Sequence, residues 1–176
     1  MSEFNWIDTS IEGFKLRFAN TADVPLIHRF IKELADFENL EDEVVSTEDQ
    51  LRQNLFGDRS YAEVILGFEG EKPAGFALFF HNFSTFVGKP GIYLEDLFVK
   101  QGMRGNGYGR EFLTYLARLA NHRDCGRLEW AVQEWNEQAI GFYESLGARQ
   151  KEEWTVYQLA GNRLKELGNS FNHTSQ

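Results

Sequence analysis

The chain has 176 residues, 42% of them hydrophobic, and its 16 Phe and 4 Trp can build the core of one sizeable domain, which argues against disorder. Its 27 acidic and 18 basic residues give a formal net charge of −9; this field repels nucleic acid and attracts small cations, although acidity also serves solubility alone. The single cysteine, Cys125, excludes an internal disulfide and a cysteine zinc site.

The N-terminal segment Met1–Trp6 lacks the basic region and apolar run of a signal peptide. No stretch of the chain approaches the ~20 apolar residues that a membrane-spanning helix needs. A cytoplasmic protein without a membrane partner is therefore expected. Residues 1–13 and 168–176 are polar and aperiodic, which predicts flexible ends on either side of one domain over residues 14–167.

The first predicted elements are a strand and two helices. Phe14–Ala19 alternates in hydrophobicity and predicts the strand. A helix is expected from an N-cap at Thr21 to about Phe37. Its apolar positions recur at helical spacing, at Val24, Ile27, Ile31 and Leu34. Residues 46–50 contain two overlapping capping-box patterns and predict a short second helix through Phe56.

Strands dominate the middle of the chain, and strands alternate with helices after it. Two β-rich runs, Tyr61–Phe68 and Ala74–Phe80, are separated by turn residues and indicate a hairpin. The later expected elements are a strand over Ile92–Val99, a helix over residues 108–119, a strand over Leu128–Val132, a helix over Glu137–Leu146, a strand over Trp154–Leu159 and a short helix over Arg163–Leu167. This order favours a mixed α/β sheet with helices on both faces.

A glycine-rich turn between a strand and a helix is the most informative segment. The strand ends near Val99, glycines recur through the turn, and a helix opens around Gly107. Small residues let the backbone approach a ligand, and amides at a helix N-terminus bind phosphate. Arg104 and Arg110 add positive charge at the same place. A phosphate-bearing ligand is expected here, although a plain glycine turn into a helix would have the same appearance.

The spacing of this turn excludes two common nucleotide loops. A dinucleotide fingerprint read from Gly105 would need glycine where Arg110 stands, and the Gly-Lys-Ser/Thr of a P-loop is absent. The Arg-x-x-Gly-x-Gly pattern at Arg104, Gly107 and Gly109 instead resembles the pyrophosphate loop of GNAT-superfamily acetyltransferases.

A second segment strengthens this resemblance. Residues 134–148 are similar to the second signature of the superfamily, with Asn136, Ala139, Tyr143 and the Gly147-Ala148 pair carrying the match. Residues 33–38 and 93–99 resemble the diamine acetyltransferase branch, which includes spermidine/spermine and thialysine acetyltransferases. The likeness extends over about residues 14–167.

The resemblance implies a mixed, mostly antiparallel sheet of six or seven strands, whose fourth and fifth strands splay apart to admit acetyl-coenzyme A. Pantetheine would lie along the backbone of Leu97, Phe98 and Val99. The pyrophosphate would lie on the loop formed by Arg104, Gly105, Asn106, Gly107, Tyr108, Gly109 and Arg110. The far wall of the cleft would be formed by Asn136, Ala139 and Tyr143. Family members are commonly homodimers, so a homodimer is expected by analogy.

The chemistry of acetyl transfer to an amine needs a proton acceptor and a proton donor. An amine of pKa near 10 is mostly protonated at neutral pH and has no lone pair for attack. By resemblance Glu95 is the base, directly or through water, and Tyr143 donates to the leaving sulfur. Strand alternation predicts that only one of Glu95 and Asp96 points into the cleft. A strand end and a core tyrosine are the alternatives for these residues.

The implied substrate is the primary amine of a small cation. Phe37, Glu38, Glu152 and Trp154 match positions near the amine site of relatives, as do Glu95 and Asp96. Polyamine-specific relatives carry an acidic residue and a tryptophan in the preceding loop, where this chain has Ser84 and Phe86. The loop is more similar to thialysine-type members, which favours a lysine analogue or a short diamine.

Two other functions remain open at this point. A GNAT-like domain could bind coenzyme A or a polyamine as a sensor without turnover, or it could acetylate a protein amine. No metal ion is expected in any of these functions. The four histidines, His28, His81, His122 and His173, do not have the spacing of metal ligands.

Overall fold

The computed structural model describes residues 5–151 and 155–171. The chain falls into two compact units, Met1–Ala131 and Val132–Gln176. The first unit contains the sheet and its covering helices, and the second contains the last two helices.

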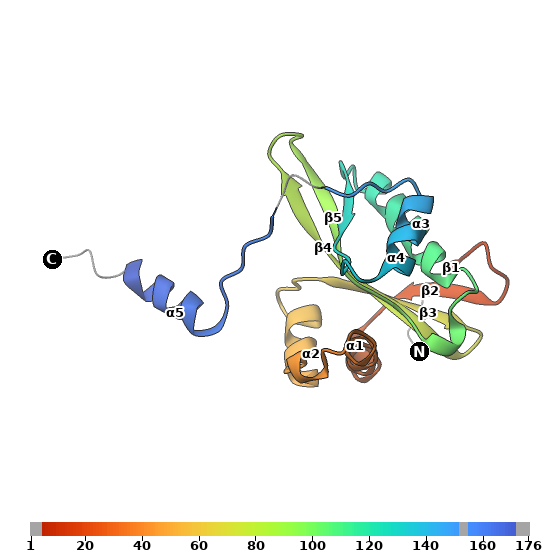
Figure 1. Cartoon of the computed structure of the whole chain (residues 1–176). Coiled ribbons are helices and arrows are strands. Elements are labelled where there is room, and N and C mark those ends of the chain that lie inside the picture. Colours follow the sequence, from red (N-terminus) through yellow and green to blue (C-terminus); the bar gives the residue numbers. More distant parts are fainter. Residues whose placement is uncertain (1–4, 152–154, 172–176) are drawn as a thin grey trace. The chain divides into compact units, whose positions relative to one another are not determined.

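The first unit is built on a six-stranded sheet in which neighbours in sequence are neighbours in space (Figure 1). Its strands are β1 (Ile7–Asp8), β2 (Phe14–Phe18), β3 (Glu63–Glu69), β4 (Lys72–Ser84), β5 (Lys89–Val99) and β6 (Leu128–Trp130). Strands β1 to β5 pair antiparallel, and β6 pairs parallel with β5. The expected mixed, mostly antiparallel sheet is confirmed.

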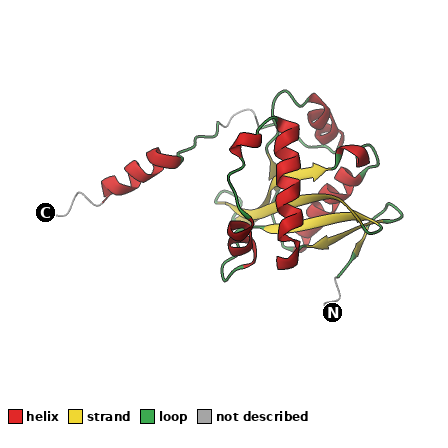
Figure 2. Cartoon of the chain, turned by 90° about the horizontal axis from the view of Figure 1, so that it is seen from below, coloured by secondary structure: helices red, strands yellow, loops and turns green. Residues whose placement is uncertain are grey.

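Helices cover both faces of this sheet. Helices α1 (Val24–Glu38) and α2 (Glu48–Phe56) lie on one face and α3 (Tyr108–His122) on the other (Figures 1 and 2). Short 3-10 turns occur at Thr21–Asp23, Glu41–Glu43 and Gln101–Met103. In the second unit α4 spans Glu137–Ser145 and α5 spans Gly161–Ser170. Helices on both faces are therefore confirmed within the first unit.

The two faces of the sheet have separate apolar cores. On the α1 face, Ile27 and Phe30 are completely buried against the Leu66 side of β3. On the α3 face, the Phe14 ring stacks on Tyr108 with ring centroids 3.9 Å apart and meets Phe112 edge-on. A Cβ at Gly67 would come within 2.7 Å of both phenylalanine rings, so only glycine fits where the sheet supports this cluster.

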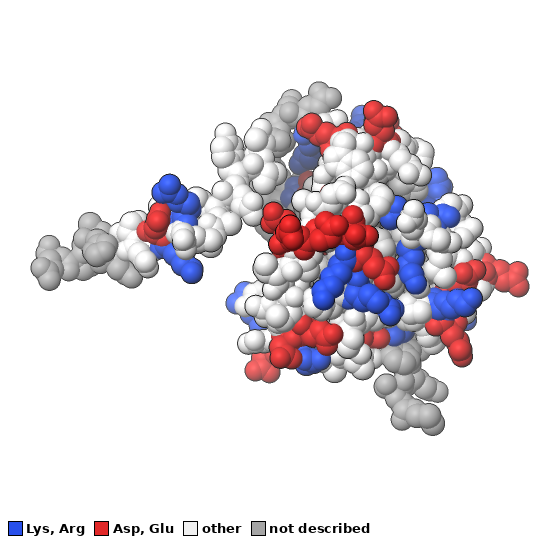
Figure 3. Space-filling model, turned by 60° about the horizontal axis from the view of Figure 1, so that its bottom comes forward, with Lys and Arg blue, Asp and Glu red and all other residues white. Residues whose placement is uncertain are grey.

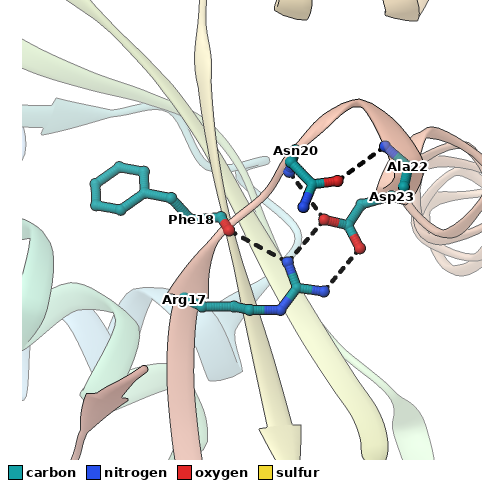
Figure 4. Close-up of polar contacts among 5 residues, drawn as sticks. All are labelled: Arg17, Phe18, Asn20, Ala22 and Asp23. Atoms are coloured by element: carbon teal, nitrogen blue, oxygen red, sulfur yellow. Dashed lines mark hydrogen bonds and ion pairs between the residues drawn. The ribbon is translucent and has the colours of Figure 1, made fainter. Parts of the chain in front are cut away.

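A buried ion pair fixes the junction between β2 and α1 (Figure 4). Arg17 donates two hydrogen bonds of 2.7 Å to the carboxylate of Asp23. Asp23 also accepts from the backbone N–H of Asn20, while the Asn20 side chain accepts from the N–H of Ala22. The sequence predicted Thr21 as the N-cap of the helix. In the structure Asn20 and Asp23 form a reciprocal capping box around the 3-10 turn Thr21–Asp23, and Asp23 is the N-cap of α1.

Strand β5 contains a register shift at the sequence Glu95-Asp96. Leu78 of β4 pairs with Asp96 and Phe79 pairs with Leu94, so Glu95 is the extra residue of a β-bulge. On its other edge, β5 pairs with β6 only over Ile92–Leu94. Within the described residues, the segment 97–99 therefore has a strand neighbour on one side only. The fourth and fifth strands of the sequence prediction, over Ile92–Val99 and Leu128–Val132, correspond to β5 and β6, since β1 was not predicted.

Three other sequence predictions differ from the structure. The predicted flexible segment 1–13 includes β1, whose Ile7 pairs with Leu16. The last strand predicted, Trp154–Leu159, is wrong over residues 155–159, which have no regular structure; Trp154 itself lies outside the described residues. Helix α5 extends beyond the predicted Arg163–Leu167 at both ends.

Candidate active site

Three acidic side chains, Glu38 at the end of α1 and Glu95 and Asp96 at the bulge of β5, form an acidic cluster in which the charges of Glu38 and Glu95 act on Asp96. Helix α1 ends at Glu38, and Asn39 follows in the left-handed conformation, with φ 57°. Burial, and then the negative charges of Glu95 and Glu38, raise the pKa of Asp96 from 3.8 to about 6. Burial also raises the pKa of Glu38. The cluster joins three predicted site residues from two separate elements.

Glu95, the extra residue of the β-bulge, affects the ionisation of nearby residues on either side of it. The Tyr93 ring lies 5.2 Å from that of Phe80, measured between centroids. Burial raises the pKa of Tyr93, and the charges of Glu95 and Glu129 raise it further. Glu95 thus acts electrostatically on both Tyr93 and Asp96. Glu95 is exposed and Asp96 is half-buried. At a bulge, strand alternation by itself does not determine where the two side chains point, so the expectation that only one of them enters the cleft stays a prediction.

The glycine turn is exposed and conformationally special. Gly105 and Gly107 have φ of 83° and 84°, values that favour glycine. Gly107 is the N-cap of α3, so the first amides of that helix, including those of Tyr108 and Gly109, have no acceptor within the helix. Residues 105–107 and Arg110 are exposed. The turn is therefore open to an anionic ligand.

The side chains of Arg104, Tyr108 and Arg110 differ in their burial and in their contacts. Tyr108 is only 4% exposed and packs in the core, so it can offer a ligand its backbone amide but not its ring. Arg104 donates from Nε to the carbonyl of Val99 at 2.9 Å. Its guanidinium carbon lies 4.1 Å from the centroid of the Phe37 ring. Of the two arginines predicted for phosphate, Arg104 faces the end of α1, whereas Arg110 is at the exposed start of α3.

The second unit holds the other predicted residues. Asn136 is the N-cap of α4, and its side-chain oxygen accepts from the N–H of Ala139 at 3.1 Å. Tyr143 lies on the same helix, with its ring 5.4 Å from that of Phe142, measured between centroids. The second signature therefore forms one local structure, a capped helix that carries the predicted acid.

Two predicted substrate residues lie away from the acidic cluster. Ser84 and Phe86 are at the tip of the β4–β5 hairpin, where Phe86 is 93% exposed. Ser84 pairs with Lys89, whereas Asp96 pairs with Leu78, a separation of roughly 20 Å at about 3.4 Å per residue. Within one chain the structure does not bring these two residues to the carboxylates. Glu152 and Trp154 lie outside the described residues.

Two negative findings concern the described part of the chain. Among these residues, no group of three or more His, Cys, Asp or Glu could hold a metal ion. No helix formed by them is long and apolar enough to cross a membrane.

Comparison with known families identifies the fold and its chemistry. The sequence model of the acetyltransferase (GNAT) family matches residues 28–148, well over half of the chain. The chain belongs to the GNAT family. The matched region contains Glu38, the bulged strand, the glycine turn and both residues of the capped helix, Asn136 and Tyr143.

Curated relatives and solved structures agree with this GNAT assignment. The chain is 34% identical to the thialysine N-epsilon-acetyltransferase of Bos taurus, over 86% of this chain and 95% of the relative. It is 31% identical to an L-ornithine N5-acetyltransferase of Arabidopsis thaliana, over 87% of each. An integron cassette protein of V. cholerae superimposes with a TM-score of 0.76 at 28% identity, covering 90% of this chain and 99% of that protein. This GNAT protein is thus an acyltransferase of the N-acetyltransferase class.

The sequence did not indicate how Arg104, Phe37 and the bulge combine. Arg104 and Phe37 are far apart in the chain, and no periodicity relates them. The bulge has no local signal either, since residues 92–99 read as an ordinary strand. Both features arise from the pairing of β5 with β4 and from the docking of α1.

Proposed function

We propose that this GNAT acetyltransferase transfers the acetyl group of acetyl-coenzyme A to the primary amine of a small cationic molecule. The observation that carries the proposal is the acidic cluster of Glu38, Glu95 and Asp96. Each cause of the raised pKa of Asp96, burial and two negative charges, opposes ionisation. A bound ammonium group would supply the opposite charge that favours the ionised carboxylate. The relatives named for thialysine and ornithine, both small amines, agree with this substrate class.

The glycine turn supports the cofactor part of the proposal. The amides of residues 105–109 and the exposed side chain of Arg110 suit the pyrophosphate of acetyl-coenzyme A, whereas the backbone N–H of Arg110 donates to the carbonyl of Gly107. The one-sided backbone of Leu97–Val99 suits the amide groups of pantetheine, because an unpaired strand edge offers hydrogen bonds to an extended ligand. The acetyl thioester is the chemistry that the cofactor brings when it is bound.

Glu95 and Tyr143 manage the protons of the reaction. Glu95 takes a proton from the bound ammonium, directly or through water, and so frees the nitrogen lone pair. The nitrogen then attacks the thioester carbonyl and a C–N bond forms. As the C–S bond breaks, the nitrogen releases its second proton to water and Tyr143 gives its phenolic proton to the departing sulfur; water afterwards returns a proton to Tyr143. The products are the N-acetylated amine and free coenzyme A.

A thiol-release assay with a panel of amines tests the proposal. The panel contains thialysine, lysine, ornithine, putrescine and spermidine, and a basic peptide represents protein amines. We expect turnover with a lysine analogue or a short diamine. Binding of coenzyme A without thiol release for any amine would support a sensor and contradict the proposal, and turnover of the peptide alone would move the substrate class to proteins.

The proposed acetyltransferase domain spans residues 14–167 and acts as a cytoplasmic homodimer. The family match, which extends over residues 28–148, supports an enzyme contained within these bounds. Sedimentation velocity of the full chain tests the dimer, for which we expect twice the mass of the 20.4 kDa chain.

A further inference from the structure

Arg104 has a use that its place in the glycine turn does not suggest. Its Nε donates to the carbonyl of Val99, the last residue of β5. The guanidinium carbon lies 4.1 Å from the centroid of Phe37, close enough for a strong cation–π contact, and 5.8 Å from that of Phe98. The planar group is therefore packed between the end of β5 and the end of α1.

The surroundings of Arg104 are those of a packed side chain. Residues 105–107 beside it are exposed, whereas Arg104 is half-buried. Burial lowers the pKa of its guanidinium, which reflects the loss of water around the group. An exposed arginine that binds phosphate at the surface would keep its hydration shell until the ligand arrives.

Phe37 connects this contact to the acidic cluster. It immediately precedes Glu38, the last residue of α1, whose negative charge acts on Asp96. The helix stops there, with Asn39 in the left-handed conformation. Backbone hydrogen bonds close the helix here, from the N–H of Asn39 to the carbonyls of Ala35 and Asp36 and from the N–H of Leu40 to the carbonyl of Ala35. These bonds hold the backbone, so the contact of Arg104 with Phe37 adds to them by setting how the side-chain end of α1 packs against β5.

We propose that Arg104 is a positioning residue of the amine site: its guanidinium holds Phe37 and thereby keeps Glu38 beside Asp96. This inference rests on the proposed function for the identity of the substrate. It assigns the two arginines of the turn to different ligands. Arg104 serves the amine through α1, and Arg110 serves the phosphates of the cofactor directly.

Matched substitutions in the one turn test the proposal. Steady-state kinetics of Arg104→Gln should show a KM for the amine raised about tenfold, the loss expected for one cation–π contact, with the KM for acetyl-coenzyme A changed less than twofold. Arg110→Gln should show the reverse pattern. A raised KM for acetyl-coenzyme A in Arg104→Gln, with that for the amine unchanged, would overturn the proposal.

Four further variants separate the stacking contact from charge and from a general loss of fold. Arg104→Lys keeps the charge but loses the planar group and Nε, so the KM for the amine should stay raised; a normal value would contradict the stacking contact. Phe37→Leu should reproduce the effect of Arg104→Gln, and Phe37→Tyr should lose less. The double variant Arg104→Gln/Phe37→Leu should be no worse than the poorer single variant. Additive effects would show that the residues act independently.

These outcomes are distinct from a failure of the proposed function. If the unchanged protein acetylates no amine in the panel, the proposed function fails before any variant is measured. If it is active and the kinetic split is absent, only the role of Arg104 fails. Calorimetry of acetyl-coenzyme A with Arg104→Gln reports whether the turn is intact, and if that variant does not fold, Arg104→Lys and Phe37→Leu carry the same test.

Discussion

The surroundings of Asp96 strongly change its acid–base chemistry. A pKa of about 6 makes this carboxyl protonated in mildly acidic solution and ionised above neutrality. In the proposed site an ionised Asp96 helps to hold the cationic amine, so kcat/KM should fall as the pH drops through about 6, in addition to any effect of Glu38, whose pKa is also raised.

The raised pKa of Asp96 also predicts a pH-dependent cost to folding. Between pH 3.8 and about 6 the folded chain binds more protons at this position than the unfolded chain, so its contribution to stability falls as the pH rises. Asp96→Asn should exceed the wild type in unfolding free energy by about 2–3 kcal/mol at pH 8 and by almost nothing below pH 4. Urea titrations at both pH values measure this, with the exposed Asp42→Asn as a control for the lost charge. A gain of the same size at both pH values would mean that ionisation of Asp96 does not cause it.

A third prediction at the scale of single residues concerns Tyr143. Tyr143→Phe removes the proposed proton donor but keeps the ring, so kcat should fall by ~10²-fold or more. Binding of acetyl-coenzyme A, followed by calorimetry, should be nearly unchanged. Phe142→Leu on the same helix controls for general damage to α4. Equal turnover by Tyr143→Phe and the wild type would remove Tyr143 from the mechanism.

At the scale of elements, the junction of β2 with α1 determines where the acidic cluster can form. Helix α1 begins beside the Arg17–Asp23 pair and ends at Glu38, so a shift at its start would move its far end. Burial alone would raise the pKa of Asp23, but hydrogen bonds from Arg17 and from the Asn20 backbone outweigh it, and the pKa is lowered.

Removal of one member of this ion pair should be costly. Asp23→Asn leaves the buried Arg17 without its carboxylate partner, which predicts a loss of ~3 kcal/mol of unfolding free energy at pH 7. Because the pKa of Asp23 is lowered, this contribution is complete above pH 3.8 and disappears as the pH falls through the lowered value. Thermal and urea unfolding measure the loss. The exposed Asp49→Asn on α2, which breaks a surface pair with Arg52, should have little effect; equal losses in both variants would refute the role of burial.

At the scale of the whole molecule, the net charge of −9 predicts how salt affects activity. Acidic side chains gather in groups on the face of the molecule over α1 and α2 (Figure 3). A field of this sign attracts a cationic amine, and salt screens it with a Debye length of about 10 Å at 0.1 M.

The prediction is a fall in kcat/KM for a doubly charged amine of several-fold between about 0.02 M and 0.3 M salt. A singly charged amine of similar size should lose less. Initial rates across a salt series measure both, with sodium chloride and potassium chloride compared to detect specific ion effects. The same salt dependence for both amines would exclude a steering role for the protein charge.

The sequence by itself determined the local elements and the family. Helices α1, α2, α3 and α4 follow from apolar spacing and caps, such as the Thr47–Gln50 box at the start of α2. The glycine turn and the second signature were recognisable because the motifs of the GNAT family have particular residues at short spacings. Such signals depend on neighbours within a few positions, and a linear sequence displays them directly.

Only the tertiary structure decided how the site is assembled. The bulge at Glu95 arises from the register of β5 against β4, and the unusual ionisation of Asp96 arises from burial beside α1. The stacking of Arg104 on Phe37 joins two segments that are distant in the chain. Register, burial and long-range contacts depend on all the packed elements together, so the residues of any one segment do not specify them.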